Sequence, residues 1–131
     1  MKKHQQHMTK AERLINDQQT QHGERLRAIF PKAADYTGYA LYVRVRALEV
    51  EAHKLAEDQC NRPLSESYVE RKEESILSRL DDILGFRERK IPIFCNGDPR
   101  GYGLKIREAD AKNLDIHKDW GGYGIIAPDF T

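Results

Sequence analysis

The pattern of apolar and polar positions predicts that the first two thirds of the chain is helical. From about Tyr36 to Cys60, apolar residues recur at steps of three and four, which places one apolar stripe along a helix. Tyr39, Tyr42, Val43 and Val50 widen this stripe, so we expect the helix to contact more than one surface. The stripe itself consists of Leu41, Val45, Leu48, Ala52 and Leu55.

A helix is also predicted before this one. Thr9 and Glu12 have capping-box spacing, in which the threonine hydroxyl accepts from a first-turn amide and the glutamate reaches back. We therefore expect the helix to begin at Thr9. An apolar patch follows Gly23 and is closed by Pro31; it consists of Leu26, Ile29 and Phe30.

A third helix is predicted to begin near Ser65 or Ser67, after Pro63 ends the long helix. Ser67 and Glu70 again have capping-box spacing, and Gly85 is placed as a C-terminal cap. The inward stripe is predicted to be Tyr68, Val69, Lys72, Ile76, Leu80 and Ile83, with Lys72 burying at most its stem.

The last third of the chain has turn and strand character. Six of the nine glycines lie in 97–124, where short β-prone runs alternate with turns. Pro92 removes a backbone donor and indicates an edge strand. The predicted strands are KIPIFC at 90–95, YGLKI at 102–106 and YGIIAP at 123–128, with a hairpin joining the first two.

These elements predict an α+β fold in a single domain, residues 1–131. Long N-terminal helices over 1–85 pack with a small C-terminal antiparallel β-sheet, and 86–131 forms the β-rich, ligand-binding part. So few elements leave little core, and exposed Tyr39 and Tyr42 would be costly. We therefore expect a homo-oligomer, a dimer or higher, with the long helix or the sheet in its interface.

Composition narrows the class of protein. The chain has 33% charged residues but a formal net charge of only +1, so binding to nucleic acid is not expected. Cys60 and Cys95 make no disulfide framework, and no apolar run has the length of a signal peptide core or a membrane span. These features favour a cytoplasmic protein with reduced thiols and no membrane contact.

The richest candidate chemistry is the stretch CNGDPRGYG at 95–103. Asn96 offers donors and an acceptor, Asp98 can accept from a ribose diol, and Arg100 can hold a phosphate. The same residues also fit a plain chain reversal between strands, and the sequence leaves both interpretations open. Aromatic residues that could stack on a base are Phe86, Tyr102 and Trp120.

Other chemistry has weaker support. His117 and Asp119 could form an acid–base pair, but they also fit a solvated loop before Gly121 and Gly122. The run RERK at 87–90 is either a solvated strand entrance or an attractor for an anion. The histidines and cysteines lack the spacing of a metal site, and no cofactor-binding motif is present, so we expect neither metal nor cofactor.

An aromatic residue followed ten positions later by an Asn-Gly-Asp turn, after a helical N-terminal half, resembles the phage anti-Thoeris sponge proteins. These proteins sequester the cyclic ADP-ribose isomer that a bacterial TIR-domain protein makes during infection. The matching positions are Phe86, Asn96 and Asp98. The resemblance implies that Phe86 stacks on the base and that Asn96 and Asp98 contact polar groups. It also implies phosphate-binding arginines from both subunits of a dimer, for which Arg62 and Arg100 are the candidates.

The resemblance implies a non-enzymatic protein that binds a cyclic ADP-ribose-type nucleotide in the cytoplasm of the bacterial host and blocks Thoeris defence. Two alternatives stay open. One is a small phage-encoded inhibitor that binds a host enzyme, which the charged helices and the tyrosines of 36–60 favour. The other is a nucleotide hydrolase that uses His117 and Asp119 or Asp98.

Overall fold

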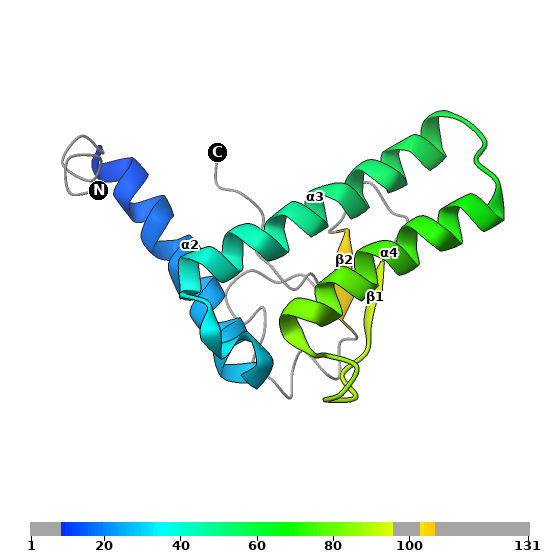
Figure 1. Ribbon diagram of the computed structural model, residues 1–131. Coiled ribbons are helices and arrows are strands. Elements are labelled where there is room, and N and C mark those ends of the chain that lie inside the picture. Colours follow the sequence, from blue (N-terminus) through cyan, green and yellow to red (C-terminus); the bar gives the residue numbers. More distant parts are fainter. Residues whose placement is uncertain (1–8, 96–102, 107–131) are drawn as a thin grey trace.

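The computed structural model describes residues 9–95 and 103–106, and within them it confirms the α+β fold (Figure 1). Helices α3 and α4 run antiparallel side by side, α2 crosses the N-terminal end of α3, and a two-stranded antiparallel sheet lies against the helical pair. None of the helices described is both long and apolar enough to cross a bilayer. The elements are α2 (Lys10–Ile29), η1 (Pro31–Asp35), α3 (Gly38–Asn61), α4 (Glu66–Leu84), β1 (Ile93–Cys95) and β2 (Leu104–Ile106).

Side-chain caps set the start of each α-helix. The Thr9 hydroxyl accepts from the amide of Glu12 at 3.1 Å, which confirms the predicted start of α2. Ser65 accepts from the amide of Tyr68 at 3.2 Å and so caps α4. The capping role predicted for Ser67 is therefore wrong, because Ser67 already lies inside the first turn.

The C-terminal end of α4 also follows the prediction. Gly85 has a φ of 67°, in the left-handed region that glycine adopts without a Cβ penalty. Its amide donates to the carbonyl of Asp81 at 2.7 Å. The chain can therefore turn sharply from α4 toward the sheet.

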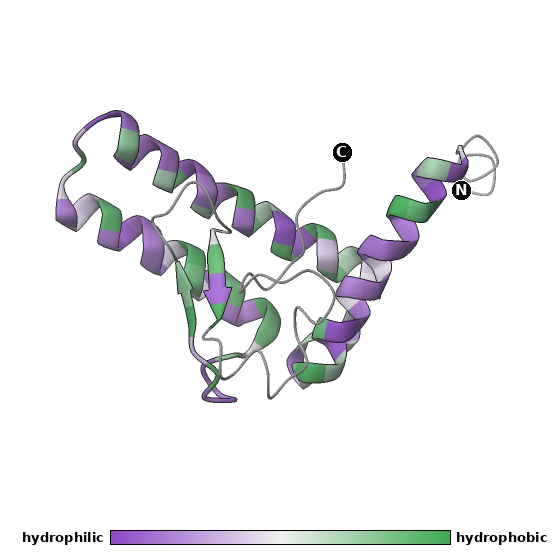
Figure 2. Ribbon diagram, turned by 180° about the vertical axis from the view of Figure 1, so that it is seen from behind, coloured by the Kyte–Doolittle hydropathy of each residue, from purple (hydrophilic) through white to green (hydrophobic). Residues whose placement is uncertain are grey.

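The core lies between the helices and the sheet, and the predicted stripe of α3 is buried in it. Figure 2 shows how hydrophobic and hydrophilic residues alternate along the helices. Tyr42 joins the core, whereas Tyr39, Val43 and Val50 are 45–51% exposed. The predicted stripe of α4 fails at its N-terminal end, where Tyr68 and Lys72 are exposed. That end of α4 lies beyond the reach of the sheet, so there is less of the fold to bury it (Figure 1).

The crossing of α2 over α3 depends on two glycines. A Cβ added to Gly23 would lie 1.7 Å from the carbonyl oxygen of Gly38, and one added to Gly38 would lie 2.7 Å from the carbonyl oxygen of Thr20. The Glu24 carboxylate accepts from the amide of Gly38 at 3.1 Å and pairs with Arg27 at 3.0 Å. The two helices thus meet backbone to backbone, with a charged cap beside the contact.

The sheet is held against α3 by a third glycine. Strands β1 and β2 pair in antiparallel register, with Ile93 opposite Ile106 and Cys95 opposite Leu104. A Cβ added to Gly103, directly before β2, would lie 2.6 Å from the carbonyl oxygen of Glu49. The antiparallel pairing confirms the predicted pair of strands, but both are shorter than predicted: β1 begins at Ile93 because Lys90 still belongs to the preceding turn, and β2 begins at Leu104. The third predicted strand, 123–128, lies outside the described residues.

We predict that Gly23→Ala destabilises the protein by about 1–3 kcal/mol, because the methyl group has no room beside Gly38. Elsewhere in a helix the same change would stabilise by up to about 1 kcal/mol. Urea denaturation of both proteins measures the difference. Gln21→Ala, at an exposed position of the same helix, is the control and should change stability by less than about 0.5 kcal/mol. An equally stable Gly23→Ala variant would contradict the close crossing.

Candidate functional site

The segment between α4 and β1 is a tight turn held by its own backbone. The amide of Lys90 donates to the carbonyl of Arg87, and the amide of Ile91 donates to that of Phe86, both at 3.1 Å. Lys90 has a φ of 57°, which places a residue other than glycine in the left-handed region. The Arg89 guanidinium donates to the carbonyl of Ile29 at 2.7 Å and ties the turn to the end of α2. This segment is therefore well fixed.

An open depression of about 240 Å³ lies on this turn. Sites for drug-sized ligands span roughly 300–1,000 Å³, so the depression accommodates one part of a nucleotide, such as a base or a phosphate group. Because Phe86 is only 4% exposed, its ring is mainly a core side chain and offers the depression an edge. The lining residues are Phe86, Arg87, Lys90, Ile91 and Pro92.

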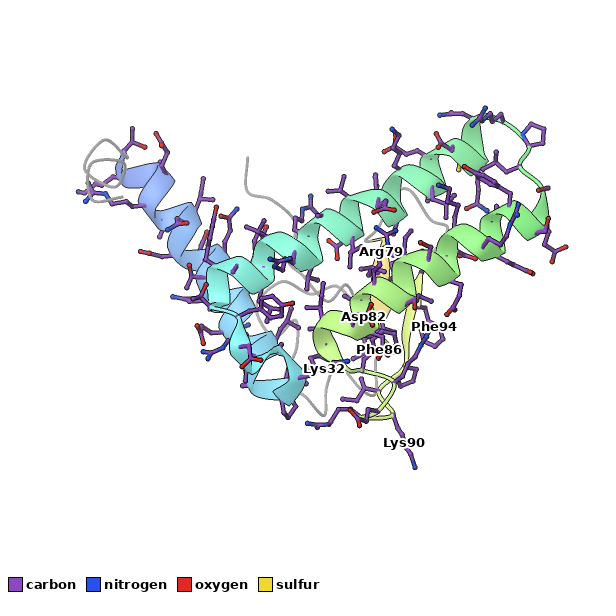
Figure 3. All side chains as sticks on the ribbon, in the orientation of Figure 1. Lys32, Arg79, Asp82, Phe86, Lys90 and Phe94 are labelled. Carbon is purple, nitrogen blue, oxygen red and sulfur yellow. The ribbon has the colours of Figure 1, made fainter. Side chains whose placement is uncertain are left out.

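The basic residues of the run 87–90 have different roles. The Arg87 guanidinium lies 5.7 Å from the centre of the Phe86 ring and bonds the Glu74 carboxylate at 2.8 and 3.0 Å, so a local carboxylate offsets its charge. Arg89 is used to bind the end of α2. Lys90 is exposed and extends away from the turn (Figure 3). Within the described residues, Lys90 is the lining cation best placed to meet an anion.

Phe94 is an exposed aromatic residue that the sequence analysis did not single out. It is 48% exposed, on the outer side of β1, and its cross-strand neighbour is Lys105 (Figure 3). Ile91 and Ile93 are buried, whereas Pro92 is half-buried and Phe94 exposed. The strand period of two in the segment 91–94 could have revealed Phe94 from the sequence.

Of the predicted site residues, the structure describes Phe86 and Arg62. Phe86 lies in the wall of the depression, as just described. Arg62 caps the C-terminal end of α3, at the far end of α4 from Phe86, and the 19 residues of α4 span roughly 28 Å. One chain therefore does not bring Arg62 and Phe86 together. Asn96, Asp98, Arg100, Tyr102 and Trp120 lie outside the described residues, as do His117 and Asp119.

A group of charges surrounds the hairpin where it meets the helices. Arg79 on α4 bonds the Glu51 carboxylate on α3 at 2.9 and 2.5 Å, and this bond lowers the pKa of Glu51. Burial, followed by the charges of Glu73 and Glu51, raises the pKa of the Cys95 thiol to about 12. Cys95 is therefore a neutral thiol at the base of the turn. The described part of the chain contains no group of three His, Cys, Asp or Glu residues able to hold a metal ion.

Comparison of the chain with protein-family models, with curated proteins and with solved structures finds no match.

We predict that the two thiols differ strongly in reactivity. Cys60 is exposed, whereas Cys95 is half-buried with its pKa raised to about 12, so it holds almost no thiolate at pH 8. With a chromogenic disulfide reagent, Cys60 should react at least about 100-fold faster. The variants Cys60→Ser and Cys95→Ser assign the two phases. Equal rates in the two single variants would show that Cys95 is not shielded as described.

Proposed function

We propose that this protein binds and sequesters a cyclic ADP-ribose-type nucleotide without cleaving it, and that it thereby blocks Thoeris defence in the host cytoplasm. The observation that carries the proposal is the depression beside the hairpin, a mostly apolar surface that includes an aromatic edge and the stems of Arg87 and Lys90, with the exposed lysine at its rim. Nucleotides require an apolar surface for the base and cations for the phosphates. The resemblance to the anti-Thoeris sponge proteins supports the same ligand class.

The hairpin supports the proposal by its position. The paired strands β1 and β2 flank the segment that contains NGDPRG, so the strands hold both ends of this segment close together. Pro92 both lines the depression and leads into β1. Asn96, Asp98, Arg100 and Tyr102 are proposed to complete the site from this turn, together with Trp120. The limited volume of the depression is consistent with such shared recognition.

Phosphate recognition is proposed to involve a second subunit. Arg62 is too far along α4 to reach Phe86 of its own chain, but it is exposed at the end of the helical hairpin. In a homo-oligomer, Arg62 of a neighbouring subunit would be free to approach the depression. This arrangement agrees with the two-subunit sites that the family resemblance implies.

A second candidate function is inhibition of a host enzyme by direct protein contact. The observation in its favour is a row of exposed apolar residues on α3, Tyr39, Val43 and Val50, at spacings that place them near one face. The same row would also serve a homo-oligomer. A stoichiometric partner captured from host lysate by the parent protein, but not by Val43→Asp, would favour the inhibitor.

We predict that calorimetric titration with cyclic ADP-ribose isomers gives saturable binding to at least one isomer. Heating the complex and chromatographing the supernatant should return that isomer unchanged, because the proposal includes no bond cleavage. A chemically altered product would instead support the hydrolase alternative, with His117 as the first residue to replace. No binding of any isomer would contradict the proposed function.

We predict that Asn96→Ala and Lys90→Asn each weaken binding by about tenfold or more, since each removes a polar contact with the ligand. Asparagine tolerates the left-handed conformation at position 90, so this change isolates the loss of charge. Lys54→Gln removes the same charge from an exposed position of α3 and should leave affinity unchanged. Phe86→Ala is unsuitable as a test, because emptying this buried position would cost about 3–5 kcal/mol.

A further inference from the structure

A nucleotide site needs an aromatic face that the ligand can reach, and the position of Phe86 does not offer one. At 4% exposure, the Phe86 ring is covered by its neighbours, and the guanidinium of Arg87 lies above it at 5.7 Å. A base could stack on Phe86 only if that packing opened. The geometry therefore points to another aromatic residue as the stacking surface.

Phe94 has the exposure that stacking requires. Its side chain is 48% exposed on the outer side of β1 (Figure 3). The backbone beneath it is fixed, because both strands bury their inner side chains in the core; these are Ile93, Leu104 and Ile106. An exposed ring on an immobilised strand loses little entropy when it binds, which favours affinity.

Phe94 on the outer side of the hairpin lies two residues along the chain from the lining of the depression. Pro92 lines the depression, and Phe94 follows it by two residues, which is the spacing of side chains on one side of a strand. Lys105 faces Phe94 across the ladder, where cross-strand side chains have Cβ atoms about 5 Å apart. We call Pro92 and Phe94 the apolar track; Lys105 lies beside it.

The positive charge of Lys105 beside this track favours an anionic occupant. The charge of Lys105 would not strengthen the binding of an uncharged apolar partner. A nucleotide, in contrast, combines a planar base with anionic phosphates that the lysine attracts. Aromatic rings beside cations bind nucleotides by stacking on the base and attracting the phosphate. Lys105 lies opposite the ring across the ladder, so a phosphate can be held next to the stacked base.

We propose that Phe94 provides the stacking surface for the base of the bound nucleotide and that Lys105, beside it, attracts the phosphate. This inference rests on the proposed function and assigns the stacking role to Phe94 in place of Phe86. Phe86 then serves as the buried support of the depression.

The test is titration of the isomer that the parent protein binds into a set of Phe94 variants. Phe94→Ala and Phe94→Leu should each lose about 10- to 100-fold in affinity, and Phe94→Tyr should stay within about threefold of the parent. The midpoints of thermal unfolding should be similar, because the side chain is largely exposed. Leu14→Ala, a matched change at a 61% exposed position on α2, should bind like the parent.

A structural readout separates stacking from a general loss of apolar surface. In the complex, nuclear Overhauser contacts should join the ring protons of Phe94 to protons of the base. Lys105→Met should weaken both binding and its dependence on salt, and Lys105→Arg should restore them.

The outcomes separate a failure of the stacking role of Phe94 from a failure of the proposed function. If the parent binds and the Phe94 variants bind equally well, or if the base contacts only Phe86, the role of Phe94 is overturned and the proposed function stands. If the parent binds no isomer, the proposed function fails and this inference fails with it.

Discussion

The described structure depends on the close approach of backbone to α3 at two points. At one end Gly38 meets Gly23 of α2, and in the middle Gly103 meets the backbone at Glu49, where even one methyl group would collide. Glycine makes such contact possible because no Cβ separates the chains. The first contact sets the direction of α2, and the second places the hairpin against α3. The depression lies on the turn between α4 and β1, where the chain passes from the helices to the hairpin.

The charged residues near the depression largely support the structure. Arg87 is held by Glu74, Arg89 by the end of α2, and Arg79 by Glu51 across the helical pair. The exposed ion pairs Arg87–Glu74 and Arg79–Glu51 contribute less than about 1 kcal/mol each to stability, so their main effect is to fix the positions of the elements that they join. The bonds of Arg87 and Arg89 fix the turn that carries Lys90, whereas the Arg79–Glu51 pair joins α4 to α3. Lys90 is therefore presented by a rigid segment. The basic residues of the run 87–90 thus have two roles: Arg87 and Arg89 bind other parts of the structure, and Lys90 is exposed.

Much of the local structure could be predicted from the sequence because its causes are local. The Thr9 cap, the Gly85 cap and the apolar stripe of α3 depend on residues within a turn or two of one another. The pairing of β1 with β2 was predicted for the same reason, since short strands close in sequence have few other partners. The helix α4 begins at the first of its two predicted starts, Ser65, because serine caps a helix without a capping box; the capping-box spacing of Ser67 with Glu70 favoured the wrong serine.

Within the described residues, the sequence by itself therefore determined the α+β class, the three long helices and the two paired strands, although both strands are shorter than predicted. Only the tertiary structure decided which residues are accessible. It buries Glu49 and Phe86, exposes Phe94, and separates Arg62 from Phe86 by the length of α4. The physical reason is that burial depends on contacts between segments far apart in the chain. A pattern of neighbouring residues defines a helix face, whereas the packing of the other elements selects which face is covered.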